Sequence, residues 1–416
     1  LGLVLLLLTL GILLSMPSVQ TMLGQKATQF LNEEFKTDIT VEEANFTIFG
    51  GVKLKKVLIR DHKKDTLFYI KTLKTNILDA KKLYEGDLHF GEVRMDGLFF
   101  NLKNYKGEKD NNLDKFIDLL DDGKPSQSKK KFLLTANEFH LTNSTFSFND
   151  YNLESPLLFS AKKLNAVTTK FKILGPDVTT SIKEMSFVDN RGLVVDDLIS
   201  DFTYTKKNIL LEKLTVKTPE SRLEGNVALR YDRKDFSDFN NKVIFDIKID
   251  KASVSSNDMK HYYGEFGRNQ QFNVRGKLLG TLNNFSTKKL KLIDDNNSEI
   301  IGDFTFKNLF SKNKGDFYMK GDFSKVSSTY TNLIAILPKV LGNNLPTTFK
   351  KFGAFTLSGT TEVTLKTIKA DILLKTALGN AKSNLSMTSI DNIDNATYIG
   401  NIQLDNFNLG KLLNRT

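Results

Sequence analysis

The chain has 416 residues, of which 26% are charged and 40% hydrophobic, and its formal net charge is +11. The charged fraction excludes a polytopic membrane protein, and the many Phe, Ile, Leu and Val residues exclude a wholly disordered chain. Cysteine is absent, which excludes disulfide frameworks, thiolate metal sites and cysteine nucleophiles.

The positive charge does not predict a nucleic-acid partner. The lysines are spread along the whole chain, largely at alternate positions of strand-like segments, as is typical of a solvated sheet face. Trp is absent, and no aromatic motif is flanked by Arg in the way that base stacking requires. We therefore expect the basic surface to face water or a membrane.

Residues 1–16 are uncharged and rich in Leu, which predicts a membrane segment. Sixteen residues are fewer than the about 20 of a full span, and the chain begins without Met or a basic stretch, so we expect its start to be missing. A cleaved signal peptide is the alternative, but no small-x-small site or lipidated Cys follows Met16, which favours a retained anchor. The expected anchor residues are Leu3, Leu6, Leu10 and Leu13.

In residues 17–36 the apolar side chains recur at three- and four-residue steps, which predicts an amphipathic helix. Two roles are open for its apolar stripe. It could lie on the bilayer surface, or it could cover the first open end of a sheet.

A period of two follows and predicts half-buried antiparallel strands with one apolar face. It covers residues 37–105, a main segment 132–329 and a further segment 353–416, and in one strand Val93, Met95, Gly97 and Phe99 share a face. The fold class is therefore mainly β, an elongated one-faced sheet. The residues expected on its apolar face are Phe202, Val227, Phe245, Ile247, Ile249, Leu278, Phe304, Phe306 and Leu357.

Two insertions interrupt the strands. Residues 106–131 contain a short predicted helix, NLDKFIDLLDD, followed by a Lys- and Ser-rich linker. Residues 330–352 contain two short amphipathic pieces broken at Pro338 and Pro346, which are either covers over the sheet or, as we favour, ordinary packing helices.

No catalytic or metal-binding motif is evident. His62, His89, His140 and His261 lie far apart, without ligand spacing. The segment from Asp294 to Glu299 has the composition of a calcium loop but lacks its central Gly and its Glu, so it predicts a hairpin turn. The acidic residues Asp118, Asp121 and Asp122 lie beside the linker, where burial cannot separate their pKa values. We expect no enzyme activity, no cofactor and no metal.

The order of segments resembles the TamB/AsmA family. The segments that carry the resemblance are the anchor ending at a Pro, the amphipathic helix, and the stretches FGGVKLKKVLIRD, LHFGEVRMDGLFFNL, NLDKFIDLL, EMSFVDNRGLVVDDLISDFTYTKKNILLEKLTVKTPESRLEGNVALRY and LDNFNLGKLL. The resemblance rests on pattern and turn residues. The family's C-terminal domain is not found in this sequence.

The resemblance implies a taco-like β-groove that is anchored in the inner membrane of a diderm bacterium and extends into the periplasm. Its apolar interior would carry phospholipid acyl chains to the outer membrane. The alternative is an assembly factor for outer-membrane proteins that acts by β-strand addition. In both cases an outer-membrane barrel partner would be contacted through the missing C-terminal part.

Overall fold

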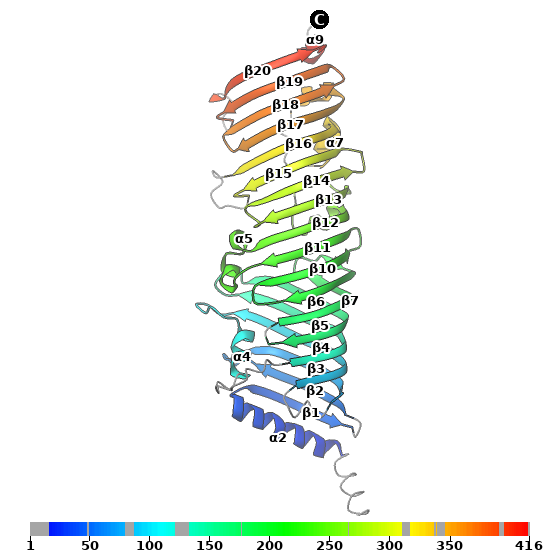
Figure 1. Cartoon of the computed structure of the whole chain (residues 1–416), viewed down its shortest axis with the longest axis vertical. Coiled ribbons are helices and arrows are strands. Elements are labelled where there is room, and N and C mark those ends of the chain that lie inside the picture. The colour runs from blue at the N-terminus through cyan, green and yellow to red at the C-terminus, as the bar shows by residue number, and fades with distance from the viewer. Residues whose placement is uncertain are drawn as a thin grey trace, which may run out of the picture. The chain divides into compact units, whose positions relative to one another are not determined.

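The computed structural model describes residues 16–47, 50–79, 87–120, 133–175, 177–264, 266–309, 317–336, 338, 346–390 and 395–414. The chain is mainly β, with 63% of the described residues in strands. It divides into two compact units, Leu1–Leu211 and Glu212–Thr416, and most of their helices and strands are labelled in Figure 1. The predicted β class is confirmed.

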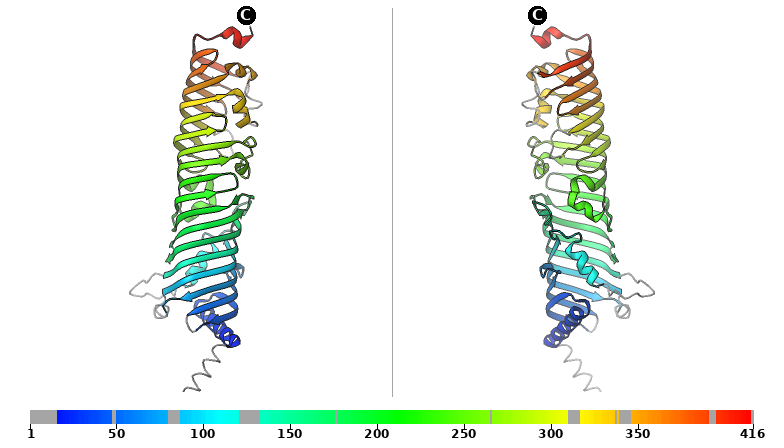
Figure 2. Two further views of the ribbon diagram at one scale, coloured as in Figure 1. Left: turned by 90° about the vertical axis from the view of Figure 1, so that its right-hand side faces the viewer. Right: turned by 90° about the vertical axis from the view of Figure 1, so that its left-hand side faces the viewer.

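The first unit begins with a helix and continues as a sheet. Its elements are α2 (Pro17–Phe35), β1 (Asp38–Phe46), β2 (Gly51–Arg60), β3 (Thr66–Ile77), β4 (Asp87–Asn104), α4 (Asn112–Leu120), β5 (Leu133–Asp150), β6 (Leu157–Leu174), β7 (Asp177–Asp189), β8 (Val194–Val195) and β9 (Asp197–Tyr204). Helix α4 lies against the strands of this unit (Figure 2).

Helix α2 covers the free edge of β1. Gln20 donates its side-chain amide to the carbonyl of Phe46 at 2.7 Å and accepts the Phe46 N–H at 2.8 Å. Asn32 makes the same pair of bonds with Ile39, each at 2.8 Å. These side chains satisfy backbone groups that an uncovered edge strand exposes. Of the two roles open for the amphipathic helix, the described residues bear out the covering of the sheet end.

Strands β4 and β5 pair in parallel, whereas the other strand pairs of known register in the described residues are antiparallel. A parallel pair needs a long crossover connection. The insertion predicted at residues 106–131 lies in this connection, and α4 forms part of it. The antiparallel prediction is thus wrong for this one pair, because the insertion returns the chain to the same end of the sheet.

The apolar face of β4 changes phase at Gly97. This residue has φ +65°, and beyond it Leu98 pairs with Ile70 while Phe100 pairs with Phe68. The Phe68 and Phe100 rings stack with centroids 4.5 Å apart. Met95 and Leu98, three positions apart, both pack against the same core cluster. The prediction that Phe99 shares the face of Val93 and Met95 is therefore wrong, because the left-handed residue between them shifts the alternation by one position.

The second unit is a run of antiparallel strands with short helices at their ends. Strand β10 (Asn208–Lys217) contains the division between the units, and the later elements are β11 (Arg222–Arg230), η1 (Arg233–Asp238), α5 (Phe239–Lys242), β12 (Ile244–Ser255), α6 (Ser256–Met259), β13 (Gln271–Gly280), β14 (Phe285–Asp294), β15 (Glu299–Lys307), β16 (Tyr318–Thr329), α7 (Tyr330–Ile336), η3 (Thr347–Phe352), β17 (Ala354–Thr364), β18 (Thr367–Thr376), β19 (Gly379–Thr388), β20 (Thr397–Asp405) and α9 (Leu409–Leu413).

From β11 to β20 each strand pairs with the next one along the chain. The sheet is open and uncurled. The taco-like curl implied by the family resemblance is therefore not found in the sheet of this unit.

Buried aspartates close several hairpins. Asp294 is 2% exposed, and its Oδ1 accepts the N–H groups of Asn296 at 2.9 Å and Ser298 at 2.6 Å. Asp189 makes the same contacts with Arg191 and Leu193. An aspartate that binds the backbone two residues ahead stabilises a turn. The interpretation of the Asp294 segment as a hairpin turn is confirmed.

Candidate functional site

Eight of the nine predicted face residues lie together on one face of the second unit. Strand register aligns Val227, Ile247, Leu278 and Phe304 in a single cross-strand row. The ninth residue, Phe202, lies in β9 of the first unit, opposite Thr180. The predicted anchor residues Leu3, Leu6, Leu10 and Leu13 lie outside the described residues. Among the described helices, none is long and apolar enough to span a membrane.

Four rows of side chains run across this face from β11 to β20, and we call them together the uncharged face. The first two rows are Leu229, Phe245, Gly280, Phe285, Phe306, Met319, Val363, Ile368, Met387 and Tyr398, and Val227, Ile247, Leu278, Thr287, Phe304, Gly321, Thr361, Ala370, Leu385 and Gly400.

The other two rows lie farther along the same strands. They are Gly225, Ile249, Gly276, Leu290, Gly302, Phe323, Gly359, Ile372, Ser383 and Ile402, and Leu223, Ala252, Val274, Leu292, Ile300, Val326, Leu357, Leu374, Ala381 and Leu404. None of the four rows contains an ionisable group other than the Tyr398 phenol. The neighbouring positions, on the opposite face, carry many Lys, Asp and Glu residues.

Bulges in alternate strands keep lysines off the uncharged face. In β12 the face contains Ile249 and then Ala252, in β14 Thr287 and then Leu290, and in β16 Phe323 and then Val326. Strict alternation would instead place a lysine on the face in each strand. These three are Lys251, Lys289 and Lys325.

The bulge in β14 is held by a side chain on the neighbouring strand. Lys289 has φ +52°, and its N–H, which the regular ladder does not use, donates to Asp303 Oδ1 at 2.8 Å. The Lys288 ammonium binds Asp303 Oδ2 at 2.7 Å. Its hydrogen bond and the backbone bond from Lys289 lower the pKa of Asp303. Asp303 thus stays ionised and satisfies the displaced backbone group.

Glycines on the intervening strands lie level with these bulges. They are Gly225 on β11, Gly276 on β13, Gly302 on β15 and Gly359 on β17. A Cβ atom on Gly302 would lie 2.3 Å from the Asp322 carbonyl oxygen. The strands therefore approach each other too closely at this level for any larger residue.

The uncharged face is only half-buried. Of the eight predicted residues on it, Phe304 alone is buried, at 7% exposure, and the other seven keep intermediate exposure. The η1–α5 segment covers one end, where the Phe239 ring lies 5.7 Å from the Phe245 ring. Apolar side chains that are aligned but incompletely covered form a surface able to take an apolar ligand.

The opposite face is charged and paired. The Glu299 carboxylate binds Lys291 at 2.8 Å and Lys325 at 2.7 Å, and these hydrogen bonds lower the pKa of Glu299. Lys320 pairs with Glu362 at 3.1 Å. The two faces of one sheet thus differ in chemistry, as half-buried antiparallel sheets do when one face meets water and the other an apolar phase.

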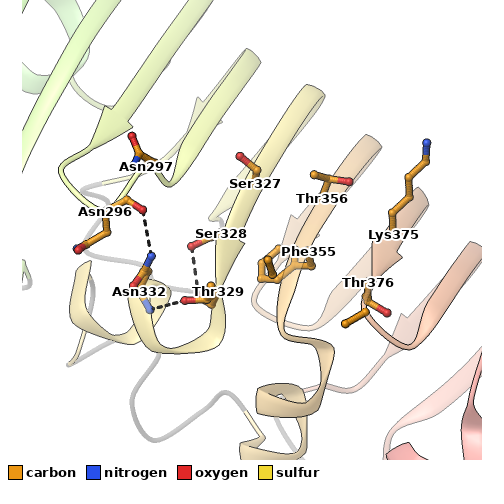
Figure 3. Close-up of a pocket in the computed structure, with 12 residues that line it drawn as sticks. Asn296, Asn297, Ser327, Ser328, Thr329, Asn332, Phe355, Thr356, Lys375 and Thr376 are labelled. Carbon is orange, nitrogen blue, oxygen red and sulfur yellow. Dashed lines mark hydrogen bonds between the residues drawn. The ribbon is translucent and has the colours of Figure 1, made fainter.

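A hollow of about 540 Å³ opens at the ends of β16, β17 and β18 (Figure 3). Amide and hydroxyl groups line it together with Phe355 and Lys375. Asn332 donates to the Asn296 carbonyl at 3.4 Å, and its own N–H donates to Thr329 Oγ1 at 3.2 Å. Among the described residues that line the hollow, none is a His, Asp or Glu.

The structure brings together one group that the sequence analysis missed. Glu92, Glu138 and His140 place a ligand atom each within 4.8 Å of one another. Glu92 lies in β4 and is far from His140 in the sequence. It comes close to His140 only because β4 pairs in parallel with β5. Asp118, from the acidic cluster considered above, lies in α4, and Asp121 and Asp122 lie outside the described residues.

The chain matches no protein-family model, and no curated protein is significantly similar to it. Function is therefore argued from the uncharged face itself.

Proposed function

We propose that this chain carries phospholipid acyl chains along the uncharged face of its second unit, anchored in the inner membrane of a diderm bacterium with its body in the periplasm. The observation that carries the proposal is the absence of charge from four aligned rows across ten strands. Membership of the TamB/AsmA family, an outer-membrane barrel partner and delivery to the outer membrane belong to the same proposal.

The energetics of lipid in water support it. Exposing about 30 acyl CH₂ groups at about 0.8 kcal/mol each costs on the order of 20 kcal/mol, so unassisted transfer is effectively blocked. Ten strands about 4.8 Å apart give an apolar path roughly 43 Å long. Such a path removes most of that cost without covalent chemistry and needs no cofactor.

The bulges support the proposal further. Three of them displace Lys251, Lys289 and Lys325 from the apolar rows. A single charge facing hydrocarbon costs several kcal/mol and would interrupt the path. A sheet whose only role was to fold would not need both the bulges and the glycines opposite them to keep one partly exposed face free of charge.

Neighbouring residues of β13 offer a matched test. Leu278 lies on the uncharged face, and Leu279 lies on the opposite face and is 55% exposed. A photo-crosslinking residue at position 278 is expected to capture phospholipid in cells, with several-fold less capture at position 279. Equal capture at the two positions would refute the proposal.

Introducing a charge at position 278 or 279 extends the test to lipid binding. Leu278→Asp is expected to lower the phospholipid that co-purifies with the detergent-solubilised chain, as measured by mass spectrometry, whereas Leu279→Asp leaves it unchanged. Both variants should keep the far-ultraviolet circular dichroism of a β protein, which shows that a loss of lipid does not come from unfolding.

The second candidate is an assembly factor that adds a strand to an exposed edge. Strand β20 is exposed along its whole length, Ile399 is 74% and Ile402 59% exposed, and its one strand partner among the described residues is β19. An accessible apolar strand edge can accept an extended peptide. Crosslinks from position 399 to outer-membrane proteins, with none to lipid from position 278, would favour this function.

A further inference from the structure

The parallel pairing of β4 and β5 places two acidic side chains directly opposite each other. Glu92 is the register partner of Glu138, and Arg94 is the register partner of His140. Like charges opposite one another on neighbouring strands destabilise a sheet. The two carboxylates therefore need positive charge beside them, and Arg94 supplies one such charge to Glu92.

The His140 ring points its Nε2 atom at both acids. This atom lies 3.1 Å from Glu92 Oε1 and 3.2 Å from Glu138 Oε1. It is buried, yet no hydrogen bond of acceptable geometry reaches it from the described residues. The two contacts are within ion-pair distance without hydrogen-bond geometry. An imidazole nitrogen and two carboxylate oxygens that converge in this way form a donor set that zinc accepts.

We propose that Glu92, Glu138 and His140 form a zinc site that joins β4 to β5. Zinc binds histidine nitrogen at about 2.0–2.1 Å and carboxylate oxygen at about 2.0–2.2 Å. With such bonds, the His140–Glu92 and His140–Glu138 separations of 3.1 and 3.2 Å each subtend about 100° at the metal, close to the tetrahedral angle. Water would complete the fourth position.

The charge around the site suits a divalent cation. Two carboxylates and one guanidinium, that of Arg94, leave a net negative charge when the imidazole is neutral. Arg94 pairs with Glu92 Oε1, and a hydrogen bond to a ligating carboxylate is the usual outer-shell contact of a metal site. Arg94 therefore orients Glu92 and does not replace the metal.

A metal at this site would link two strands that a long connection joins. Strands β4 and β5 are joined through a connection that contains α4 and residues 121–132. A metal held by ligands from both strands binds the folded state and not the unfolded chain, so it stabilises the parallel pair. The proposal does not depend on lipid carriage, since all three ligands belong to the first unit.

The test is calorimetric titration of the metal-free full chain with Zn²⁺, paired with thermal unfolding. One equivalent of Zn²⁺ is expected to bind and to raise the unfolding midpoint. His140→Gln and Glu138→Gln should each weaken binding by about tenfold or more, whereas His261→Gln, which changes an exposed histidine, should not.

Co²⁺ supplies a second readout that does not depend on stability. Substituted at the site, it is expected to give the absorption bands of a four-coordinate ion in the unmodified chain, and to lose them in His140→Gln. Absence of Zn²⁺ binding, or binding equal in the unmodified chain and in both ligand variants, would overturn the proposal and leave the group as an ion-pair cluster. Circular dichroism of the variants separates lost ligands from lost folding.

Discussion

Gly302→Ala tests the close strand approach at the level of the bulges. The new Cβ would lie 2.3 Å from the Asp322 carbonyl oxygen, about 1 Å inside an ordinary carbon–oxygen contact. Overpacking of this kind costs about 1–3 kcal/mol, and the lower chain entropy of alanine returns about 0.5–1 kcal/mol. The central values leave a net loss of about 1 kcal/mol, or roughly 2–4 °C in the unfolding midpoint.

The assay is thermal unfolding followed by circular dichroism, with urea unfolding as a second measure of free energy. Ser383→Ala is the matched control, because Ser383 lies in the same row as Gly302 and the change adds no atom. An unchanged or raised midpoint for Gly302→Ala would refute the argument that backbone contact requires glycine at this level.

Two further predictions concern polar contacts. Asp294→Ala removes the acceptor for the Asn296 and Ser298 N–H groups and should cost about 1–3 kcal/mol in unfolding experiments, since the buried Ser298 N–H loses its partner. Although burial opposes its ionisation, hydrogen bonds led by that from Lys115 lower the pKa of Glu108 to about 2. Its stabilising effect is therefore full above pH 4.5 and is lost as the pH falls to about 2, so Glu108→Gln should flatten the decline of the unfolding midpoint in that range.

Substitutions of exposed acidic residues provide the controls for these two predictions. Asp295→Ala changes the next residue of the same turn, which is exposed, and should leave the free energy of unfolding nearly unchanged. Glu154→Gln removes an exposed carboxylate of the first unit and should leave the acid decline as it is. An equal effect of Asp294→Ala and Asp295→Ala, or of Glu108→Gln and Glu154→Gln, would contradict the roles assigned to Asp294 and Glu108.

Local patterns in the sequence were sufficient for the elements and for much of the uncharged face. The helix at Pro17–Phe35 follows from its three- and four-residue apolar steps, and the hairpin at Asp294 follows from its turn residues. Eight face residues were predicted because a side-chain period of two holds between bulges. These features depend on interactions between residues close in the chain.

Tertiary structure alone decided where that period breaks and which strands meet. No local signal showed that Lys289 would take φ +52° and leave the face, because the bulge depends on Asp303 of the neighbouring strand. The grouping of Glu92, Glu138 and His140 depends likewise on a parallel pairing with a register offset of 46 residues. Alternation is a property of one strand, whereas bulges, close backbone approach and ligand clusters are properties of strand pairs, which a single sequence does not specify.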